Sequence, residues 1–205
     1  GFYEEKPHRI LPVETCLIED QKADAIIATV RSLLKSFKIK VYDEDTGYGL
    51  LRYVLIRKAE FTDEIMVVLV TASPVFPSKR NFVEALRREH PEITTVVQNI
   101  NDRTDSLVLG SKYQVLWGKG YIVDRLCGCS FKISPGSFYQ VNPIQAQKLY
   151  EKAIELADLT GKETVVDAYC GTGTIGMIAA KKAGKVFGVE SNPDAVRDAV
   201  GNAKA

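Results

Sequence analysis

The segment 167–176 constrains the fold of this chain more than any other part. Its sequence, DAYCGTGTIG, contains the pattern Gly-x-Gly-x-x-Gly and lies between a strand-like run at 164–169 and a helical run. A second strand-like run follows at 185–190, and Asn192 with Pro193 is typical of the start of a helix. Strand, glycine-rich turn, helix, strand and helix, in this order, are typical of the beginning of a doubly wound parallel sheet.

The glycine-rich turn predicts a nucleotide-binding site. Gly171, Gly173 and Gly176 let the backbone turn tightly and approach a ligand, whose polar groups can meet the free N–H groups at the helix start. Glu190 ends the second strand, 14 residues after Gly176, where its carboxylate can accept hydrogen bonds from ribose hydroxyls. The alternative is that the glycines serve only tight turns and helix packing.

Asp167 bears on which nucleotide binds. A dinucleotide would place its pyrophosphate beside this carboxylate, and two negative charges in a poorly screened cleft repel each other. S-adenosylmethionine carries an ammonium and a sulfonium group and no phosphate, so the acid favours this methyl donor over NAD. Asp167 can also cap the turn or the helix, and the two roles are compatible.

The first 133 residues read differently from the rest. Their patterns predict a helix, a hairpin, a second helix and several further strands, at 22–37, 50–59 with 64–72, 79–89, 94–101, 112–117, 121–126 and 129–133. This order indicates an α+β domain. We therefore predict an α+β central domain over 1–133 and, over 134–205, the first half of a Rossmann-like α/β domain.

Composition excludes several classes of protein. The net charge of +1 gives no sign of a nucleic-acid partner, and no run approaches the about 18 apolar residues of a membrane span. Four irregularly spaced cysteines are typical of a reducing cytosol rather than of a disulfide framework, so a cytoplasmic location is predicted. The chain begins with Gly1 and stops inside a helical run, so we expect it to be part of a longer protein.

Three segments resemble the RNA uracil-C5 methyltransferases, in particular the bacterial 23S rRNA branch. They are FKISPGSFYQVNPIQAQKLYEKA at 131–153, VVDAYCGTGTIG at 165–176 and VFGVESNPDAV at 186–196. The resemblance covers 131–205 closely and 1–130 more loosely. It implies S-adenosylmethionine as cofactor and 23S rRNA as partner.

The resemblance also implies contacts with the cofactor. Gln140 would meet the methionine end of the donor, Tyr169 would pack near its adenosine or methionyl part, and Glu190 would hold the ribose. Asp167 and the glycines, foremost Gly171 and Gly173, are added on the physical grounds above. Phe138 is a candidate stacking platform for an unpaired base, although aromatic residues before a helix are usually part of the core.

No catalytic or metal-binding residue is predicted within the chain itself. In the family a cysteine thiolate attacks C6 of uracil and a base removes the C5 proton, and both groups lie in later strands of the sheet. Cys170 is predicted to be a small apolar residue in the turn, and His8 and His90 to be surface residues. Cys16 stands where some family members have the fourth cysteine of an iron–sulfur cluster, so only a longer parent could bind one. We therefore expect the chain alone to be inactive.

Two surface expectations complete the prediction. Lys79, Arg80, Arg87 and Arg88 could form a basic face, but the interleaved Glu84 and Glu89 favour a solvated surface of salt bridges. Two parallel strands also leave an uncovered sheet edge. We expect a partner molecule to cover it, possible self-association included, or residues 160–205 to be arranged differently.

Two other classes of function stay open at this point. One is a dinucleotide-binding oxidoreductase of the NAD type, which shares the glycine-rich turn. The other is a noncatalytic RNA-binding module.

Overall fold

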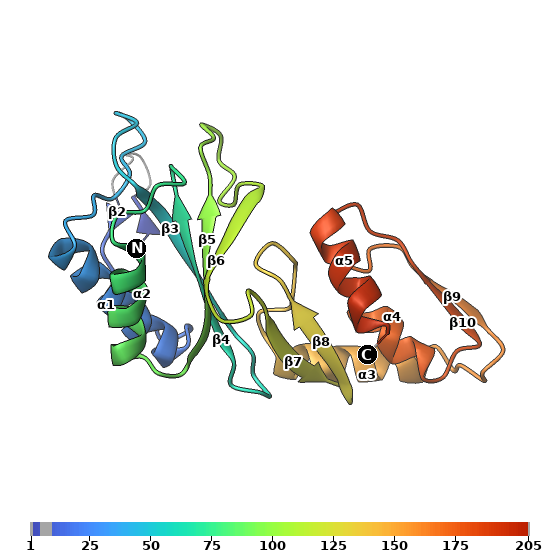
Figure 1. Ribbon diagram of the computed structural model, residues 1–205. Coiled ribbons are helices and arrows are strands. Elements are labelled where there is room, and N and C mark those ends of the chain that lie inside the picture. The colour runs from blue at the N-terminus through green and yellow to red at the C-terminus, as the bar shows by residue number, and fades with distance from the viewer. Residues whose placement is uncertain (1, 5–9, 205) are drawn as a thin grey trace.

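The computed structural model describes residues 2–4 and 10–204. A four-stranded sheet with two helices forms one part of the molecule, and a smaller part with three helices and two strands lies beside it (Figure 1). A short antiparallel pair, β1 (Phe2–Tyr3) and β2 (Ile10–Leu11), precedes the first helix, and the sequence patterns did not predict it. No helix in the described ranges is long and apolar enough to cross a membrane.

The main sheet is mixed, with the strand order β3–β4–β5–β6. The bounds are β3 Leu51–Lys58, β4 Ile65–Thr71, β5 Ile93–Ile100 and β6 Lys112–Trp117. β3 and β4 form the predicted antiparallel hairpin, but β4 and β5 run parallel, joined by α2 (Lys79–Glu89). A parallel pair needs such a crossover, because the chain must return to the same end of the sheet. The chain therefore has an α/β fold with a mixed sheet, and its division into an α+β central domain and the first half of a Rossmann-like domain stays a prediction.

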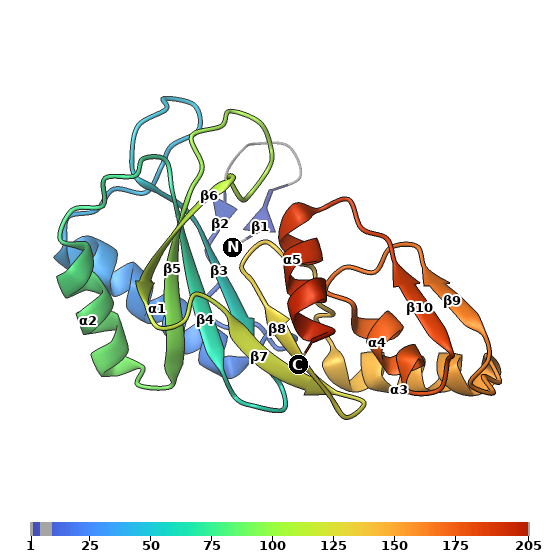
Figure 2. The ribbon, with the colours of Figure 1, turned by 45° about the vertical axis from the view of Figure 1, so that its right-hand side comes forward.

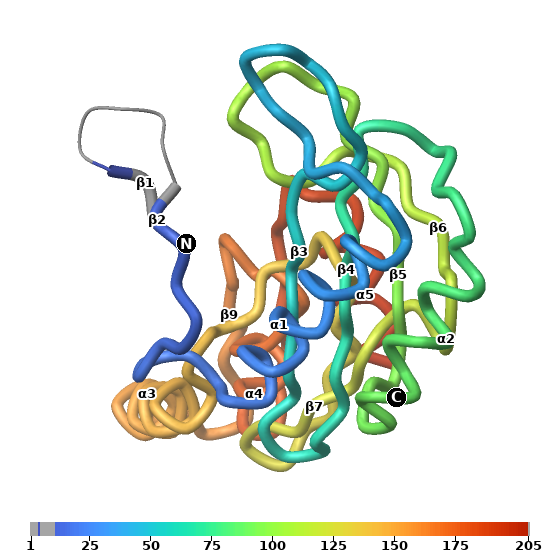
Figure 3. Tube along the Cα trace, turned by 90° about the vertical axis from the view of Figure 1, so that its left-hand side faces the viewer, coloured from blue at the N-terminus to red at the C-terminus, as the bar shows by residue number. Residues whose placement is uncertain are grey.

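The core lies on both faces of β4, whose seven residues are all buried. α1 (Gln21–Ser36) and α2 lie side by side on one face (Figure 3). There the ring of Phe82, fully buried, lies 5.5 Å from the ring of Phe37 and 5.2 Å from that of Phe76. Burial of aromatic rings contributes strongly to the stability of a protein core.

The hairpin of β7 (Ile122–Leu126) and β8 (Cys129–Ile133) belongs to both parts of the molecule. Ile122 and Ile133 pack on the second face of the main sheet, whereas Leu126 and Phe131 pack in the core of the smaller part. Figure 2 shows the hairpin between the sheet and α5. The hairpin thus sets how the two parts lie relative to each other.

The smaller part has the predicted order of strand, helix, strand and helix. Its elements are α3 Pro143–Leu156, β9 Thr164–Asp167, α4 Thr174–Ala180, β10 Lys185–Gly188 and α5 Pro193–Asn202. β9 and β10 are parallel, and α5 begins after Asn192, whose side chain accepts hydrogen bonds from Asp194 N and Ala195 N. Both strands end two residues before the predicted limits. Pairing nevertheless continues beyond them, since the amide of Val189 donates to the carbonyl of Asp167.

One face of the β9–β10 pair is covered and the other is not. Val165 and Val186 pack against α4, whereas Val166, Phe187 and Val189 are exposed. In the described part of the chain these two strands pair only with each other. Residues 160–204 therefore keep the predicted arrangement, and the edges of the β9–β10 pair stay unpaired in the described part of the chain. Self-association through this sheet stays a prediction.

Candidate functional site

The glycine-rich turn connects β9 to α4, and its two first glycines serve different purposes. Gly173 has φ +86° and precedes the helix, and a Cβ there would lie 3.4 Å from the Cβ of Ala199 on α5. Gly171 has φ +54°, and a Cβ there would have no atom within 4 Å. Gly173 thus permits close packing of α5, whereas Gly171 leaves an open surface that a ligand can approach.

Glu190 lies directly at this open surface. Its Oε2 accepts a hydrogen bond from Gly171 N at 2.9 Å, and its Oε1 accepts from Ser191 N and Asn192 N, each at 2.8 Å. The hydrogen bond from the backbone of Asn192 is the main cause that lowers the pKa of Glu190 below its ordinary value. The carboxylate is therefore ionised and oriented at neutral pH, with lone pairs left for further donors.

Asp167 holds the first turn of α4. Its Oδ2 accepts a hydrogen bond from Gly176 N at 3.1 Å, and a Cβ at Gly176 would lie 3.3 Å from the same oxygen. The capping role that the sequence left open is therefore confirmed. Gly176 permits this close approach of helix and strand.

The two residues between Asp167 and Gly171 that carry larger side chains point in different directions. Tyr169 is 93% exposed, so its ring is free to contact a ligand. Cys170 is buried against β10, where a Cβ at Gly188 would lie 2.9 Å from its Sγ. Burial, followed by the charges of Asp167 and Glu190, raises the pKa of the Cys170 thiol. Its position agrees with the predicted small apolar residue of the turn.

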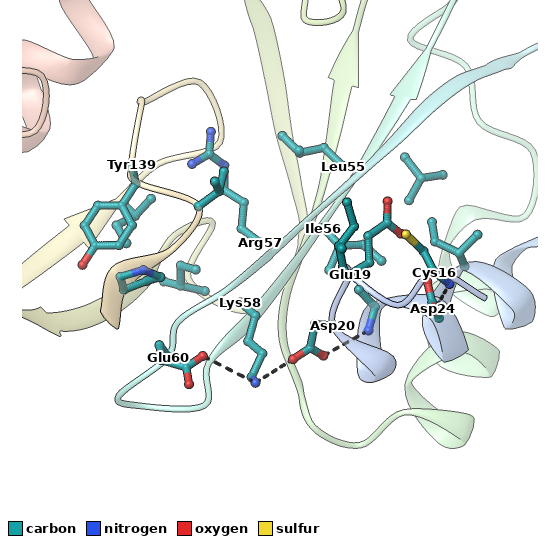
Figure 4. A pocket seen from close by; sticks show the side chains of 18 of the residues that line it. Cys16, Glu19, Asp20, Asp24, Leu55, Ile56, Arg57, Lys58, Glu60 and Tyr139 are labelled. Atoms are coloured by element: carbon teal, nitrogen blue, oxygen red, sulfur yellow. Dashed lines mark hydrogen bonds and ion pairs between the residues drawn. The ribbon is translucent and has the colours of Figure 1, made fainter. Parts of the chain in front are cut away.

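Gln140 lies on a separate loop that precedes α3. Together with Phe138 and Val141 it lines a cavity of about 720 Å³ between this loop, α1 and β3, and residues 167–190 do not line that cavity. Figure 4 shows side chains that line this cavity, with Lys58 bonded to Asp20 and with Tyr139 and Cys16 at opposite sides of the view. The structure thus brings Asp167, Gly171 and Glu190 together and places Gln140 on a neighbouring loop.

Lys58, which lines this cavity, is paired with two acids. Lys58 Nζ lies 2.7 Å from Asp20 Oδ2 and 3.8 Å from Glu60 Oε2. Cys16, which is half-buried, donates its backbone N–H to Asp24 Oδ2 at 3.0 Å. Among the described residues no group of three or more His, Cys, Asp or Glu side chains could hold a metal ion. A cluster ligand role for Cys16 stays a prediction for a longer protein.

The structure corrects the reading of His90 as a surface residue. His90 is only 8% exposed, with Nε2 2.7 Å from Thr29 Oγ1 and Nδ1 3.1 Å from Glu92 Oε1. His90 follows the last turn of α2, and its hydrogen bond with Thr29 connects this end of α2 to α1. His8 lies outside the described residues.

The basic residues of α2 also differ from the expected network of salt bridges. The guanidinium of Arg87 stacks on the ring of Trp117, 3.4 Å from its centroid, and Lys79 Nζ donates to Gln114 Oε1 at 3.2 Å. Within the described part of the chain, no ion pair joins these cations to Glu84 or Glu89. Lys79 and Arg87 therefore face β6 rather than the acids of their own helix, whereas Arg80 and Arg88 are exposed.

Sequence reasoning missed a set of buried polar side chains on α5. Asp198 and Asn202 are buried together with Ala195 on one face of this helix. The signal was present, since these three residues recur at helical spacing opposite the exposed Val196 and Val200. Polar residues on the buried face of a short helix indicate specific hydrogen-bond partners.

Comparison with known proteins gives one consistent picture. No protein-family model matches the chain. It is 42% identical over 205 residues to an uncharacterized RNA methyltransferase of Oceanobacillus iheyensis, covering 100% of the chain and 45% of that relative. It is 44% identical over 204 residues to an uncharacterized RNA methyltransferase of Halalkalibacterium halodurans, covering 100% of the chain and 44% of the relative. The chain thus spans about half the length of the relatives it matches.

A solved structure is similar to almost the whole chain. It is the tRNA (uracil-54, C5)-methyltransferase of Pyrococcus abyssi in complex with S-adenosyl-L-homocysteine, with a TM-score of 0.82 and 28% sequence identity. The match covers 98% of this chain and 48% of that protein. Both parts of the fold therefore have a counterpart in one known structure.

Proposed function

We propose that this chain carries the methyl-donor site of an S-adenosylmethionine-dependent RNA methyltransferase that acts on C5 of a uridine in 23S rRNA. The relatives named RNA methyltransferases support the reaction and the class of substrate. The similar tRNA enzyme, which contains bound S-adenosylhomocysteine, supports the donor and the C5 chemistry. The choice of 23S rRNA rests on the residue blocks at 131–153, 165–176 and 186–196 alone.

The observation that carries the donor assignment is the hydrogen bond between Glu190 and Gly171. A dinucleotide site uses the backbone N–H groups of this turn to bind pyrophosphate. Here the N–H of Gly171 is already bonded to a carboxylate at 2.9 Å. A phosphate at this place would lose that donor and face a negative charge. A ligand with hydroxyl donors and no phosphate fits, so the NAD alternative is disfavoured.

The residues of the chain fit the donor in three places. Glu190 has oxygens that can accept hydrogen bonds from ribose hydroxyls, and the open surface at Gly171 allows the ligand to approach. Tyr169 offers an exposed ring for the adenosine or methionyl part, and the resemblance at 131–153 assigns the methionine end to Gln140. The bound donor supplies an electrophilic methyl group on a sulfonium.

Methyl transfer to C5 of uracil also needs a thiolate that attacks C6 and a base that removes the C5 proton. Cys170 is buried in the turn with a raised pKa, which suits neither the attack nor access to RNA. We therefore assign both groups to regions of the enzyme outside this chain, with residues 1–133 as a central domain and 134–205 as the first part of the donor-binding domain. We expect the chain alone to transfer no methyl group.

Isothermal titration of the chain with S-adenosylhomocysteine and, separately, with NAD⁺ tests the donor assignment. We expect binding of S-adenosylhomocysteine, loss of this binding in Glu190→Ala, and no binding of NAD⁺. Binding of NAD⁺ alone would contradict the proposal.

The substrate is tested on the whole enzyme by nucleoside mass spectrometry of 23S rRNA and tRNA after incubation with S-adenosylmethionine. We expect 5-methyluridine in 23S rRNA. Methylation of tRNA only would overturn the rRNA assignment, and RNA binding without any product would favour a noncatalytic RNA-binding module.

A further inference from the structure

We infer that the buried polar face of α5 is a positioning device for the donor site: Asp198 and Asn202 hold the loop that carries Gln140 in register with the glycine-rich turn. This inference rests on the proposed function for the identity of the ligand. The link between the loop and the turn rests on the contacts alone. The experiment tests this link separately from the identity of the ligand.

Asp198 holds the start of the loop. The side chain is 1% exposed, and its carboxylate accepts hydrogen bonds from Ser134 N at 2.8 Å, Ser134 Oγ at 2.7 Å and Ser137 Oγ at 2.7 Å. Lys132 Nζ, 3.6 Å away, balances its charge. A buried carboxylate is costly unless it is paired and hydrogen-bonded, so the three donors and the cation must keep their places around it. The loop therefore cannot shift without uncovering this charge.

Asn202 reaches the two segments at once. It is 3% exposed, and its Oδ1 accepts from Lys132 N at 2.7 Å while its Nδ2 donates to Lys132 O at 3.3 Å. The same Nδ2 donates to Thr172 O, inside the glycine-rich turn, at 2.9 Å. Only a side-chain amide of this length offers an acceptor and two donors in one plane. Asn202 thus joins β8 to the turn by hydrogen bonds to backbone atoms on both sides.

Further contacts restrict the loop and the turn from the other sides. A Cβ at Gly136 would lie 2.7 Å from Tyr113 Oη, so the loop passes tightly over β6. Asn192, which caps the start of α5, donates from Nδ2 to Gly136 O at 3.4 Å. Gly173 packs on Ala199 of the same helix. Figure 2 shows α5 lying against β8 with the end of β10 at its start, so this one helix contacts the loop and the turn and begins just after Glu190.

The geometry has a functional consequence. Gln140 and Glu190 come from segments 50 residues apart in the chain, and under the proposed function they contact the two ends of one ligand. A site whose parts are held by independent flexible loops would lose affinity to the ordering of those loops on binding. The hydrogen bonds of Asp198 and Asn202 order both segments before the ligand arrives.

Asn202→Ala is the test, with Arg197→Ala, an exposed residue of the same helix, as the matched control. Hydrogen–deuterium exchange followed by mass spectrometry reads the link without any ligand. We expect faster exchange in both 132–137 and 170–176 in Asn202→Ala, with unchanged exchange in β4 and β5, and no change in the control. The dissociation constant of S-adenosylhomocysteine, measured well below the melting temperature, should rise about tenfold in Asn202→Ala.

Ser137→Ala is the milder second variant, in case Asn202→Ala fails to fold. It removes one donor to Asp198, so we expect faster exchange in 132–141 and about threefold weaker binding, the usual weight of one hydrogen bond. Exchange that changes in α5 only, or an unchanged dissociation constant in a variant with faster exchange, would overturn the inference. If the wild-type chain binds no S-adenosylhomocysteine while the exchange pattern holds, the donor assignment fails and the link between loop and turn stands.

Discussion

Replacing Gly171 by alanine separates the backbone role of this glycine from its role at the ligand surface. Its φ of +54° lies in the left-handed region, where an alanine costs about 1 kcal/mol. No atom lies within 4 Å of the added Cβ, so no clash inside the protein adds to this cost. For a chain of 205 residues, about 1 kcal/mol lowers the melting temperature by about 2–4 °C.

Gly47→Ala is the matched control for this substitution. Gly47 has φ +68°, and the nearest atom to its added Cβ is Tyr42 Oη at 4.0 Å, so its backbone cost is nearly the same. It lies in the exposed turn before β3, away from the glycine-rich turn. Both variants should therefore lose about 2–4 °C of melting temperature, equivalent to about 1 kcal/mol.

Ligand affinity should distinguish the two variants. In Gly171→Ala the methyl group occupies the surface that the donor approaches beside Glu190, so the dissociation constant of S-adenosylhomocysteine should rise at least about tenfold, equivalent to about 1.4 kcal/mol. Gly47→Ala should bind like wild type. Calorimetric titration at 20 °C and thermal melts give both quantities. Equal affinities for the two variants would refute the argument that the open surface at Gly171 is the ligand surface.

Three further predictions concern stability and reactivity. Phe82→Ala should lower the free energy of unfolding by about 3–5 kcal/mol in urea titration, since its ring is fully buried beside Phe37 and Phe76; a loss below about 1 kcal/mol would contradict this packing. Because folding lowers the pKa of Glu190 below its ordinary value of 4.5, the ionised carboxylate stabilises the native state at pH values above 4.5. This stabilisation disappears as the pH falls through the pKa of the folded protein. The difference in melting temperature between wild type and Glu190→Gln should thus be constant near neutral pH and shrink below 4.5, and growth on acidification would contradict the sign. Cys170, buried with a raised pKa, should be alkylated by iodoacetamide more slowly than the half-buried Cys16, as read by peptide mass spectrometry; equal rates would show that the turn opens.

Sequence patterns predicted the elements well where one periodicity dominated. The helices at 21–36 and 79–89 and the hairpin at 51–58 and 65–71 lie within a residue or two of their predicted ranges. The parallel pairing of β4 with β5 could not be predicted from the sequence. A fully buried strand has no alternation of polar and apolar residues that would indicate its partner strand.

The candidate site was predicted in part, for a similar reason. Asp167, Gly171 and Glu190 could be found because they lie at the ends of strands adjacent in the chain, where local order determines proximity. The spacing of Asp198 and Asn202 could indicate a buried face of the helix, but their hydrogen-bond partners could not be predicted, because those partners at 132–137 and 172 are far away in sequence. The burial of His90 could not be predicted from the sequence either, because it depends on how α2 packs against α1.

The sequence by itself determined the order of the local elements of this protein, which is strand, glycine-rich turn, helix and strand, with an acid at each strand end. Backbone sterics and helix capping act within a few residues, so a short pattern suffices to predict their result. Only the tertiary structure decided that the Glu190 carboxylate takes the N–H of Gly171, and that the polar face of α5 joins the loop of Gln140 to the turn. Those contacts arise from burial against distant segments, and the energy that selects them exists only once the chain has folded.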